Sequence, residues 1–303
     1  MRKKVGLIPA NGLGDGVLWA VLANNLNQAG YESVLFSSPL MGLKKWFPHL
    51  TIRPFLTVAE IALLPGEFDH LVVDSASYLA NPKNPKFIED VRKLKSWQPK
   101  LAIPTWNSRQ YRLDNLLAFF EENFDIRPQL REAGITPPQP LHHRCHHQRV
   151  IIHSTSSDIH RNWSAVGFIN LATRLKEMGF DPVFVMSSDE RANWQTLIDQ
   201  HHLHCPQIKT LGELATLIYQ SGWMIGNDSG VGHLASCLGI PTLTIFKRKK
   251  DSRVWRPCWA PSEMVLPWPL PKWLVKRGFW RYTISVRRVF YAFIKLTCYN
   301  DEA

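Results

Sequence analysis

The residues with the clearest chemical meaning lie between Trp223 and Phe246. The apolar run 223–225 precedes a loop that combines glycines with Asn-Asp-Ser at 227–229, and a short helical stretch and a β-branched segment after Pro241 follow. This order predicts a strand, a glycine-rich loop, a helix and a second strand. At such a loop, free backbone N–H groups and the positive end of the helix dipole favour an anion, and phosphate fits best. An ordinary turn is the alternative, because the same residue types also form turns.

A second loop of this design occurs near the N-terminus. Residues 5–9 predict a buried strand, 11–16 a glycine loop, and the apolar spacing from Val17 to Gly30 a helix. The glycines of both loops depart from G-x-G-x-x-G, and no G-K-[ST] follows either loop. These departures argue against an ordinary dinucleotide-binding fold and against a P-loop ATPase.

Length and composition indicate a globular protein with two domains. The 303 residues are 45% hydrophobic and 20% charged, enough for two cores of ordinary size. The longest apolar runs are shorter than the roughly 20 residues that span a bilayer, and the chain runs from Met1-Arg2-Lys3-Lys4 straight into a strand. Five scattered cysteines without a C-x-x-C pair indicate reduced thiols. We therefore expect a cytoplasmic protein.

Alternating strands and helices predict parallel sheets and an α/β fold. A proline-rich stretch, 136–140, separates two such regions, so we expect domains at 1–140 and 150–270 and a C-terminal segment at 271–303. The predicted strands are 5–9, 33–36, 70–74, 150–153, 182–186, 223–225 and the segment after Pro241; the predicted helices lie beyond Val17 and at 87–94, 113–124, 168–178 and 211–219.

Four motifs in order resemble glycosyltransferase family 9, the heptosyltransferases of the lipopolysaccharide inner core. The most specific is G-N-D-S-G-V-G-H-L-A at 226–235, which is similar to the family's G-N-D-S-G-P-x-H-L-A. G-D-G-V-L at 14–18 resembles its N-terminal G-D-x-L. V-I-I-H at 150–153 with R-N-W at 161–163 resembles I-x-H-P-G followed by K-x-W, and T-L-G-E-L at 210–214 resembles the segment before the donor loop.

The resemblance implies the GT-B fold, in which two Rossmann-like domains face each other across a cleft. It implies an inverting, metal-independent enzyme without a cofactor, whose donor, ADP-heptose in this family, binds the C-terminal domain. The acceptor would be a lipid-linked, phosphorylated glycan of the lipopolysaccharide core at the inner face of the inner membrane. In such a reaction a carboxylate accepts the proton of the attacking hydroxyl, and cations stabilise the leaving diphosphate.

The residue-by-residue match implies that Asp15 is the general base, whereas a helix N-cap is the alternative role for this residue. Arg161 stands where the family has a lysine and would neutralise the diphosphate; an ordinary surface cation is its alternative. The Asp228 carboxylate carries a negative charge, as phosphate does. We therefore expect Asp228 to orient the loop or the sugar. The residues matched to the donor site are Ser154, Thr155, Glu213, Asn227, Asp228, Ser229, Gly230, Val231 and His233, and those of the acceptor loop are Asn11, Gly12 and Gly14.

Two departures from the family pattern leave alternatives open. Ser154 and Thr155 replace proline and glycine, and K-R-K-K-D at 247–251 replaces G-P-T-x-P. The latter segment lies near the donor in the family, so a changed base or sugar pocket is one alternative. The alternative functions follow from these departures. The protein could transfer a sugar from another nucleotide sugar or to a protein acceptor. It could also bind a nucleotide sugar or a glycan without turnover.

The positive charge is concentrated between residues 247 and 295. This stretch holds 13 Lys and Arg against two acids, so it accounts for the whole net charge of +11. Val286, Val289, Phe290, Phe293 and Ile294 form an apolar helical stripe, with Arg281, Arg288 and Lys295 at a seven-residue spacing. A basic, aromatic amphipathic helix predicts binding to an anionic membrane surface; packing across the domains is the alternative.

Two other ligand classes are disfavoured. The histidines at 142–147 and 201–204 have cysteines beside them, but no second half at zinc-finger spacing, so we expect no metal site. No recognised nucleic-acid motif accompanies the basic stretch, so we expect no nucleic-acid partner.

Overall fold

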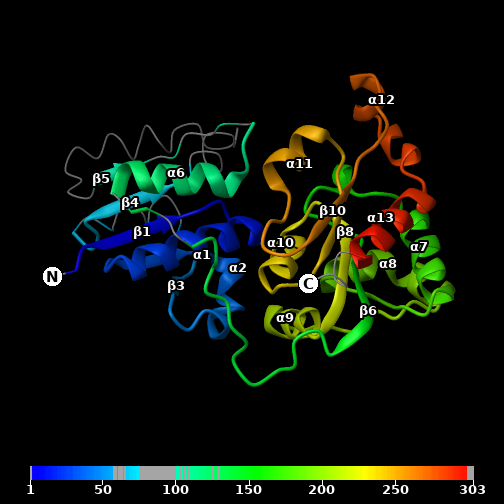
Figure 1. Cartoon of the computed structure of the whole chain (residues 1–303), viewed down its shortest axis with the longest axis horizontal. Helices are drawn as coiled ribbons and strands as arrows, with labels where there is room; N and C mark the ends of the chain where they lie inside the picture. Colours follow the sequence, from blue (N-terminus) through cyan, green and yellow to red (C-terminus); the bar gives the residue numbers. More distant parts are fainter. Residues whose placement is uncertain are drawn as a thin grey trace. The chain divides into compact units, whose positions relative to one another are not determined.

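The computed structural model describes residues 2–56, 60, 64, 66–74, 100–102, 104, 107, 109–124, 126, 127 and 130–298. The chain divides into two compact units, Met1–Pro138 and Gln139–Ala303. Each unit is built on a five-stranded sheet, and every described strand pair is parallel. Figure 1 shows both units and labels elements of each. Within the described ranges, no helix combines the length and apolar character that crossing a membrane requires.

The first sheet has the order β3-β2-β1-β4-β5. β1 pairs with β2 on one side, Val5 beside Ser33, and with β4 on the other, Gly6 beside Leu71. The order reverses between β1 and β4, which makes the carboxyl ends of these two strands a topological switch point. The strands are β1 (Lys4–Ile8), β2 (Glu32–Phe36), β3 (Thr51–Arg53), β4 (His70–Val73) and β5 (Lys100–Ala102).

Helix α1 is central to the first unit because residues 16–26 are all buried. It begins at Leu13 with Gly12 as N-cap, so the loop predicted at 11–16 is shorter, and Gly14, Asp15 and Gly16 lie in the first helical turn. The helix predicted at 113–124 is confirmed, whereas the one predicted at 87–94 lies outside the described residues. The described helices are α1 (Leu13–Gln28), α2 (Ser38–Met41), the 3₁₀ helix η1 (Lys44–Trp46) and α6 (Arg112–Phe124).

The second sheet has the order β10-β9-β8-β6-β7. Its switch point lies between β6 and β8, which are neighbours although β7 intervenes in the chain. Here Ile152 of β6 pairs with Ile225 of β8. The strands predicted at 150–153, 182–186 and 223–225 are therefore confirmed. The strands are β6 (His146–His153), β7 (Asp181–Phe184), β8 (Ser221–Asn227), β9 (Thr242–Ile245) and β10 (Ser262–Val265).

The helices predicted at 168–178 and 211–219 are confirmed as α7 and α9, whereas α8 was not predicted. α8 is polar on nearly all sides and buries one residue, Ile198, so it lacks an apolar stripe. The helices are η2 (Ile159–Arg161), α7 (Ala165–Glu177), α8 (Ser188–Gln200), α9 (Leu211–Tyr219), α10 (Gly230–Cys237), α11 (Lys249–Trp255), α12 (Lys272–Lys276), η3 (Phe279–Thr283) and α13 (Val286–Cys298).

The C-terminal stretch belongs to the core of the second unit. Val289, Phe290 and Phe293 of α13 are buried with Trp280 in the same cluster as the strands. Trp163 Nε1 donates to the Ile284 carbonyl at 3.1 Å, which joins this stretch to the chain after β6. The predicted apolar stripe thus exists, but it faces the protein interior rather than a membrane.

The seven-residue row of cations also makes contacts within the second unit. Arg281 precedes α13 and donates to the carbonyls of Asn162 and Ile159. Arg288 donates to the carbonyls of Thr283 and Leu266, and Lys295 pairs with Glu263 at 2.7 Å. The apolar face of α13 therefore packs in the core of the second unit, while binding of its cations to a membrane surface stays a prediction.

Candidate functional site

The switch point of the second sheet gathers most of the predicted donor-site residues. His153 ends β6 and Asn227 ends β8, and Gly226 pairs with His153 across the two strands. A Cβ at Gly226 would lie 2.8 Å from the His153 carbonyl oxygen, closer than ordinary packing allows. Glycine at this position therefore lets the two strand ends approach each other.

Asn227 is a structural brace of this edge. Its buried amide accepts from the Trp163 N–H at 2.9 Å and donates to the Ser154 carbonyl at 2.7 Å. Both ends of the side chain are therefore used within the protein. The contribution of Asn227 to a ligand site is to fix the two loops that follow β6 and β8.

A polar chain runs from Ser229 to Glu190. His153 Nδ1 lies 3.1 Å from Ser229 Oγ, and His153 Nε2 lies 3.3 Å from Thr155 Oγ1. Thr155 also hydrogen-bonds to the Glu190 carboxylate. Burial lowers the pKa of His153 to about 4, against the raising effect of Glu190, so the imidazole is neutral at pH 7. A neutral ring with one donor and one acceptor can orient both hydroxyls.

Asp228 is a buried carboxylate beside a cation. Burial raises the pKa of Asp228 to about 6, although Arg161 opposes the shift. Arg161 Nη1 lies 3.4 Å from Asp228 Oδ2, and Arg161 Nε lies 3.6 Å from Asp158 Oδ2. The guanidinium thus lies next to the loop after β8. At this position the guanidinium can give up its contact with a carboxylate and contact an anionic ligand instead.

Arg248 is a second cation near this loop, and the sequence analysis did not single it out. It is the N-cap of α11, three residues after the end of β9, and donates from Nε and Nη2 to Asp251 at 2.7 and 3.1 Å. The hydrogen bond to Asp251 raises the pKa of Arg248, and the carboxylates of Asp158 and Asp228, the partners of Arg161, add to this effect. The charged run at 247–251 therefore reaches the same edge of the sheet as Arg161.

The start of α10 supplies backbone donors. Ser229 is the N-cap, but its side chain makes no capping hydrogen bond, so the first-turn N–H groups are not capped by it. Gly230 and Val231 are the first two helical residues and are half-buried. An oxyanion is the ligand that such a helix start favours.

His233, one turn further along α10, is buried. Its ring makes edge contacts with Trp255 and Trp259 at centroid distances of 6.2 and 6.3 Å. Burial lowers the pKa of His233 to about 4, which keeps the ring neutral. His233 thus joins α10 to the chain around α11.

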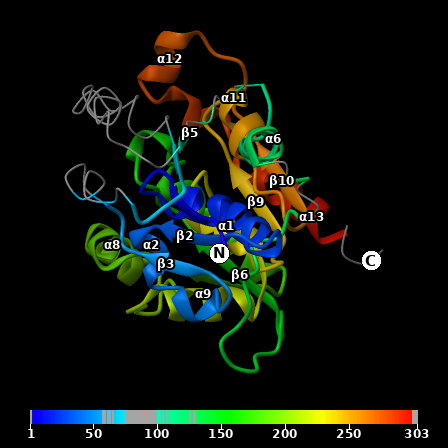
Figure 2. The same ribbon diagram turned by 90° about the vertical axis from the view of Figure 1, so that its left-hand side faces the viewer.

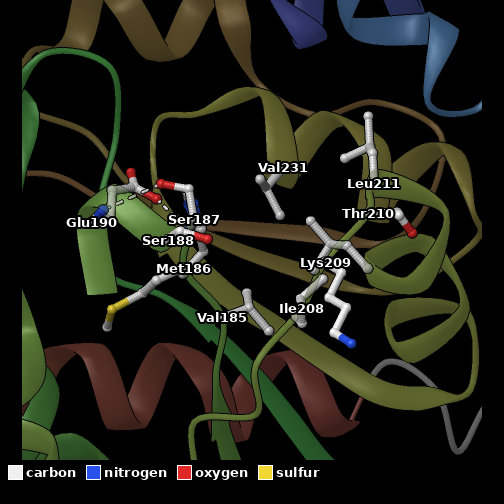
Figure 3. A pocket seen from close by; sticks show the side chains of 12 residues that line it. Val185, Met186, Ser187, Ser188, Glu190, Ile208, Lys209, Thr210, Leu211 and Val231 are labelled. Atoms are coloured by element: carbon white, nitrogen blue, oxygen red, sulfur yellow. Dashed lines mark hydrogen bonds between the residues drawn. The ribbon is translucent and has the colours of Figure 1, made fainter. Parts of the chain in front are cut away.

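A cavity of about 330 Å³ opens beside this polar chain. Its size is within the range of small-molecule sites, and aliphatic side chains dominate its wall. Figure 3 shows Glu190 and Ser187 on one side, and Lys209, Thr210 and Leu211 on the other. The lining residues are His153, Val185, Met186, Ser187, Ser188, Glu190, Ile208, Lys209, Thr210, Leu211, Leu214 and Val231.

Two glutamates occupy equivalent helical positions but different surroundings. Glu190 caps α8 by accepting from the Ser187 N–H at 2.8 Å, and Glu213 accepts from the Lys209 N–H at 2.9 Å at the start of α9. Glu190 lines the cavity, whereas Glu213 is not among its lining residues. Although burial opposes it, hydrogen bonds from Ser187 and Thr155 lower the pKa of Glu190. The pattern Ser187-x-x-Glu190 was the available sequence signal for this residue.

The switch point of the first sheet holds Asp15. This carboxylate lies in the first turn of α1, and a Cβ at Gly12 would lie 2.6 Å from Asp15 Oδ2. Gly12 is the N-cap, so the N-cap role considered for Asp15 is wrong. Asn11 is exposed, while Gly14 is buried.

A buried ion pair stands near Asp15. Arg112, the first residue of α6, donates from Nη2 to both oxygens of Asp74, which directly follows β4, at 2.9 and 2.7 Å. Burial lowers the pKa of Arg112, while the negative charges of Asp74 and Asp15 raise it. The switch point therefore combines a half-buried carboxylate with a buried cation.

The described residues contain no group of three or more His, Cys, Asp or Glu side chains that could hold a metal ion. The four histidines at 142–147 lie in and before β6, and His143 lies 3.1 Å from the Leu238 carbonyl through Nε2. We assign these residues no role in the site.

Comparison with known proteins identifies a family. The sequence model of glycosyltransferase family 9 (heptosyltransferase) matches residues 88–271. No curated protein sequence matches the chain.

Solved structures share the fold at low sequence identity. A glycosyl transferase family 9 protein from Veillonella parvula DSM 2008 has a TM-score of 0.71 at 15% identity, covering 97% of each chain. E. coli ADP-heptose LPS heptosyltransferase II has a TM-score of 0.71 at 14% identity, covering 99% of this chain and 100% of its own. E. coli heptosyltransferase WaaC with ADP has a TM-score of 0.70 at 11% identity, covering 97% and 99%. These matches show the GT-B type of fold, with two Rossmann-like units.

Proposed function

Since the chain belongs to glycosyltransferase family 9, we propose that it transfers a sugar from a nucleotide-diphosphate donor, ADP-heptose, to a glycan of the lipopolysaccharide core. The observation that carries this proposal is the juxtaposition, at one sheet edge, of an aliphatic cavity, a carboxylate, a helix start and two arginines. Each matches one part of a nucleotide sugar.

We assign the nucleoside to the cavity beside Glu190. Aliphatic side chains such as Val185, Ile208 and Leu214 suit the faces of a base, and the Glu190 carboxylate can accept hydrogen bonds from two ribose hydroxyls. The hydrogen bonds that lower its pKa keep this carboxylate ionised and therefore a strong acceptor. In this proposal Glu190 binds the ribose, and Glu213, one of the residues matched to the donor site, does not.

We assign the diphosphate to the start of α10. The N–H groups of Gly230 and Val231 and the Ser229 hydroxyl would bind its oxygens, and Val231 also lines the nucleoside cavity. Arg161 and Arg248 would neutralise the charge that develops when the sugar leaves. Two guanidinium groups can supply this charge without a metal, so we propose metal-independent transfer.

We assign the general base to Asp15. The acceptor hydroxyl attacks the anomeric carbon while its proton passes to the Asp15 carboxylate, and the bond to the diphosphate breaks with inversion at that carbon. The negative charge of Asp15 stabilises the buried Arg112 cation. Asn11, Gly12 and Gly14 would form the acceptor side of this loop.

The acceptor we propose is lipid-linked and phosphorylated, at the inner face of the inner membrane. The chain departs from the family pattern at 154–155 and 247–251. Because Arg248 lies at the donor loop, these departures favour one alternative. In it, the same residues transfer a sugar from a different nucleotide sugar.

Thermal shift with a panel of ADP-, UDP-, GDP- and CMP-sugars tests the donor, because a ligand that binds the folded state raises the melting temperature. Selective stabilisation by ADP-heptose supports the proposal. Selective stabilisation by another donor keeps the reaction and reassigns the substrate. Stabilisation without transfer to any core glycan, unchanged by Asp15→Ala, supports a binding protein instead.

Transfer that persists in EDTA supports metal independence, and its loss with recovery on adding a metal contradicts it.

A further inference from the structure

Residues 268–283 form an excursion from the second unit that is closed at its base. The chain leaves at Trp268, forms α12, turns at Gly278 and returns through η3. The Trp268 N–H donates to Thr283 Oγ1 at 3.1 Å, so the two ends of the excursion lie side by side. Gly278 has φ 87°, a left-handed turn that favours glycine. Figure 1 and Figure 2 show α12 at the outer edge of this unit. We call residues 268–282 the aromatic projection.

The aromatic projection has an inner and an outer side. Trp280 is buried in the core of the second unit, and Leu270 and Val275 pack against the same core. Four other large side chains are exposed: Trp268 by 62%, Trp273 by 59%, Phe279 by 48% and Tyr282 by 81%. The Phe279 and Tyr282 rings lie 6.2 Å apart. Soluble domains rarely gather so many exposed aromatic side chains in one short segment without a partner.

The charges of the aromatic projection define the partner. Lys272, Lys276 and Arg277 are exposed and form no ion pair with any described acid. The sequence has no acid from Met264 to Asn300, and Glu263, just before this stretch, is paired with Lys295. A second copy of the same surface would meet it with like charge, which disfavours self-association through this face. An anionic lipid surface complements the cations.

Tryptophan and tyrosine also favour the interface between water and lipid, where the ring is in a partly apolar environment and the polar atom stays wet. We propose that the aromatic projection is the membrane-contacting surface of this protein and binds anionic phospholipid headgroups. Trp268, Trp273, Phe279 and Tyr282 enter the interface, and Lys272, Lys276 and Arg277 bind phosphates. The basic helix α13 takes no part, because its apolar face is in the core.

Cosedimentation of the full chain with phosphatidylglycerol–phosphatidylcholine vesicles tests this surface without donor or acceptor. It is therefore independent of the proposed glycosyl transfer. Lys272→Gln/Lys276→Gln removes two cations from the aromatic projection, and Lys249→Gln/Lys250→Gln removes two exposed cations elsewhere in the same unit. A cation near an anionic surface contributes about 1 kcal/mol, so we expect the first pair to weaken binding about thirtyfold. The second pair is expected to change it much less.

A second pair of variants tests the aromatic side chains. Trp273→Ser/Tyr282→Ser should reduce vesicle binding at least tenfold, whereas Val166→Ser/Met178→Ser, exposed apolar residues on α7 and at its end, should not. Melting temperatures close to wild type ensure that all variants fold. Equal losses in the two cation pairs, or unchanged binding in Trp273→Ser/Tyr282→Ser, would overturn the proposal. A dimer that dissociates in Trp273→Ser/Tyr282→Ser without any vesicle binding would assign the surface to a second copy instead.

Discussion

The Asp228 carboxylate lies 3.4 Å from the Arg161 guanidinium at the end of β8, yet burial outweighs this cation and raises the pKa of Asp228 to about 6. A carboxylate whose folded pKa exceeds its unfolded value binds its proton more tightly in the folded state. Its contribution to stability is present below the unfolded value of 3.8 and is lost as pH rises through about 6. At neutral pH the site therefore holds a destabilising charge beside Arg161.

Asp228→Asn should remove this pH dependence. Relative to wild type, the variant should gain about 2 kcal/mol in the free energy of unfolding between pH 4.5 and pH 7.5. Urea titrations of both proteins at these pH values measure the difference, in which the titration of all other groups cancels. A difference that does not change with pH would mean that the Asp228 carboxylate is not perturbed by burial.

Arg248→Ala should weaken the affinity for a nucleotide diphosphate by about tenfold or more, because a charged hydrogen bond is worth about 1.5–3 kcal/mol. Lys250→Ala removes an equal charge two residues away and serves as the matched control. Calorimetry with ADP and with adenosine separates the contributions, since only ADP carries the phosphates. An equal loss for adenosine, or an equal loss in the Lys250 variant, would contradict a direct role of Arg248.

Glu190→Gln should weaken ADP binding about tenfold, because the amide replaces one of the two oxygens that accept from the ribose hydroxyls. Glutamine can retain the backbone contact at the helix start, so the melting temperature should change little. Glu213→Gln is the control, since Glu213 also accepts from a backbone N–H at a helix start but does not line the cavity. Equal ADP affinities in the two variants would contradict the assignment of the ribose to Glu190.

Gly12→Ala should displace the Asp15 carboxylate, because the new methyl group would lie 2.6 Å from Asp15 Oδ2 in the present geometry. We expect kcat to fall more than tenfold while the melting temperature changes little, since a half-buried side chain can move aside. Asp15→Asn, which keeps the shape but removes the base, should lose transfer and retain donor affinity. If Gly12→Ala retains wild-type kcat, the position of this carboxylate does not limit transfer.

Trp280→Ala should destabilise the second unit by about 3–5 kcal/mol, the usual cost of removing a buried tryptophan. Trp280 is fully buried although the preceding residue, Phe279, is exposed, and it joins the aromatic projection to the core. Trp268→Ala, at an exposed position in the same segment, is the control and should have a small effect on thermal or urea unfolding. Similar melting temperatures in the two variants would show that this segment is not part of the folding core.

The buried elements could be predicted from the sequence. β6, β8 and α9 combine an apolar run or stripe with clear boundaries, and α9 has the predicted bounds. The short strands β3, β5 and β10 were not predicted, because their three or four residues include polar or charged side chains and form no apolar run. The polar helix α8 was missed because it has no stripe of apolar residues at helical spacing.

The loops of the candidate site that follow a strand could be predicted from the sequence. Contacts between residues that are distant in the sequence could not. The segments ending at His153 and Asn227 and the donor loop were identified from local pattern and resemblance. Arg248, Arg112 and the assignment of Glu190 rather than Glu213 depend on which loops the sheet order brings together. The orientation of α13 likewise depends on which core residues its apolar face packs against, and no local pattern reveals this.

The hydrogen bond from Trp163 to Ile284 has a consequence for the order of folding. It joins residues 121 positions apart, and the same core contains Leu296. During synthesis the first unit can acquire its described contacts once residue 136 has emerged, whereas the core of the second unit stays incomplete until its last helix has left the ribosome. Long-range closure of this kind is slow, and an unfinished sheet exposes apolar strands meanwhile. We expect the second unit to be the part that depends on chaperones in the cell.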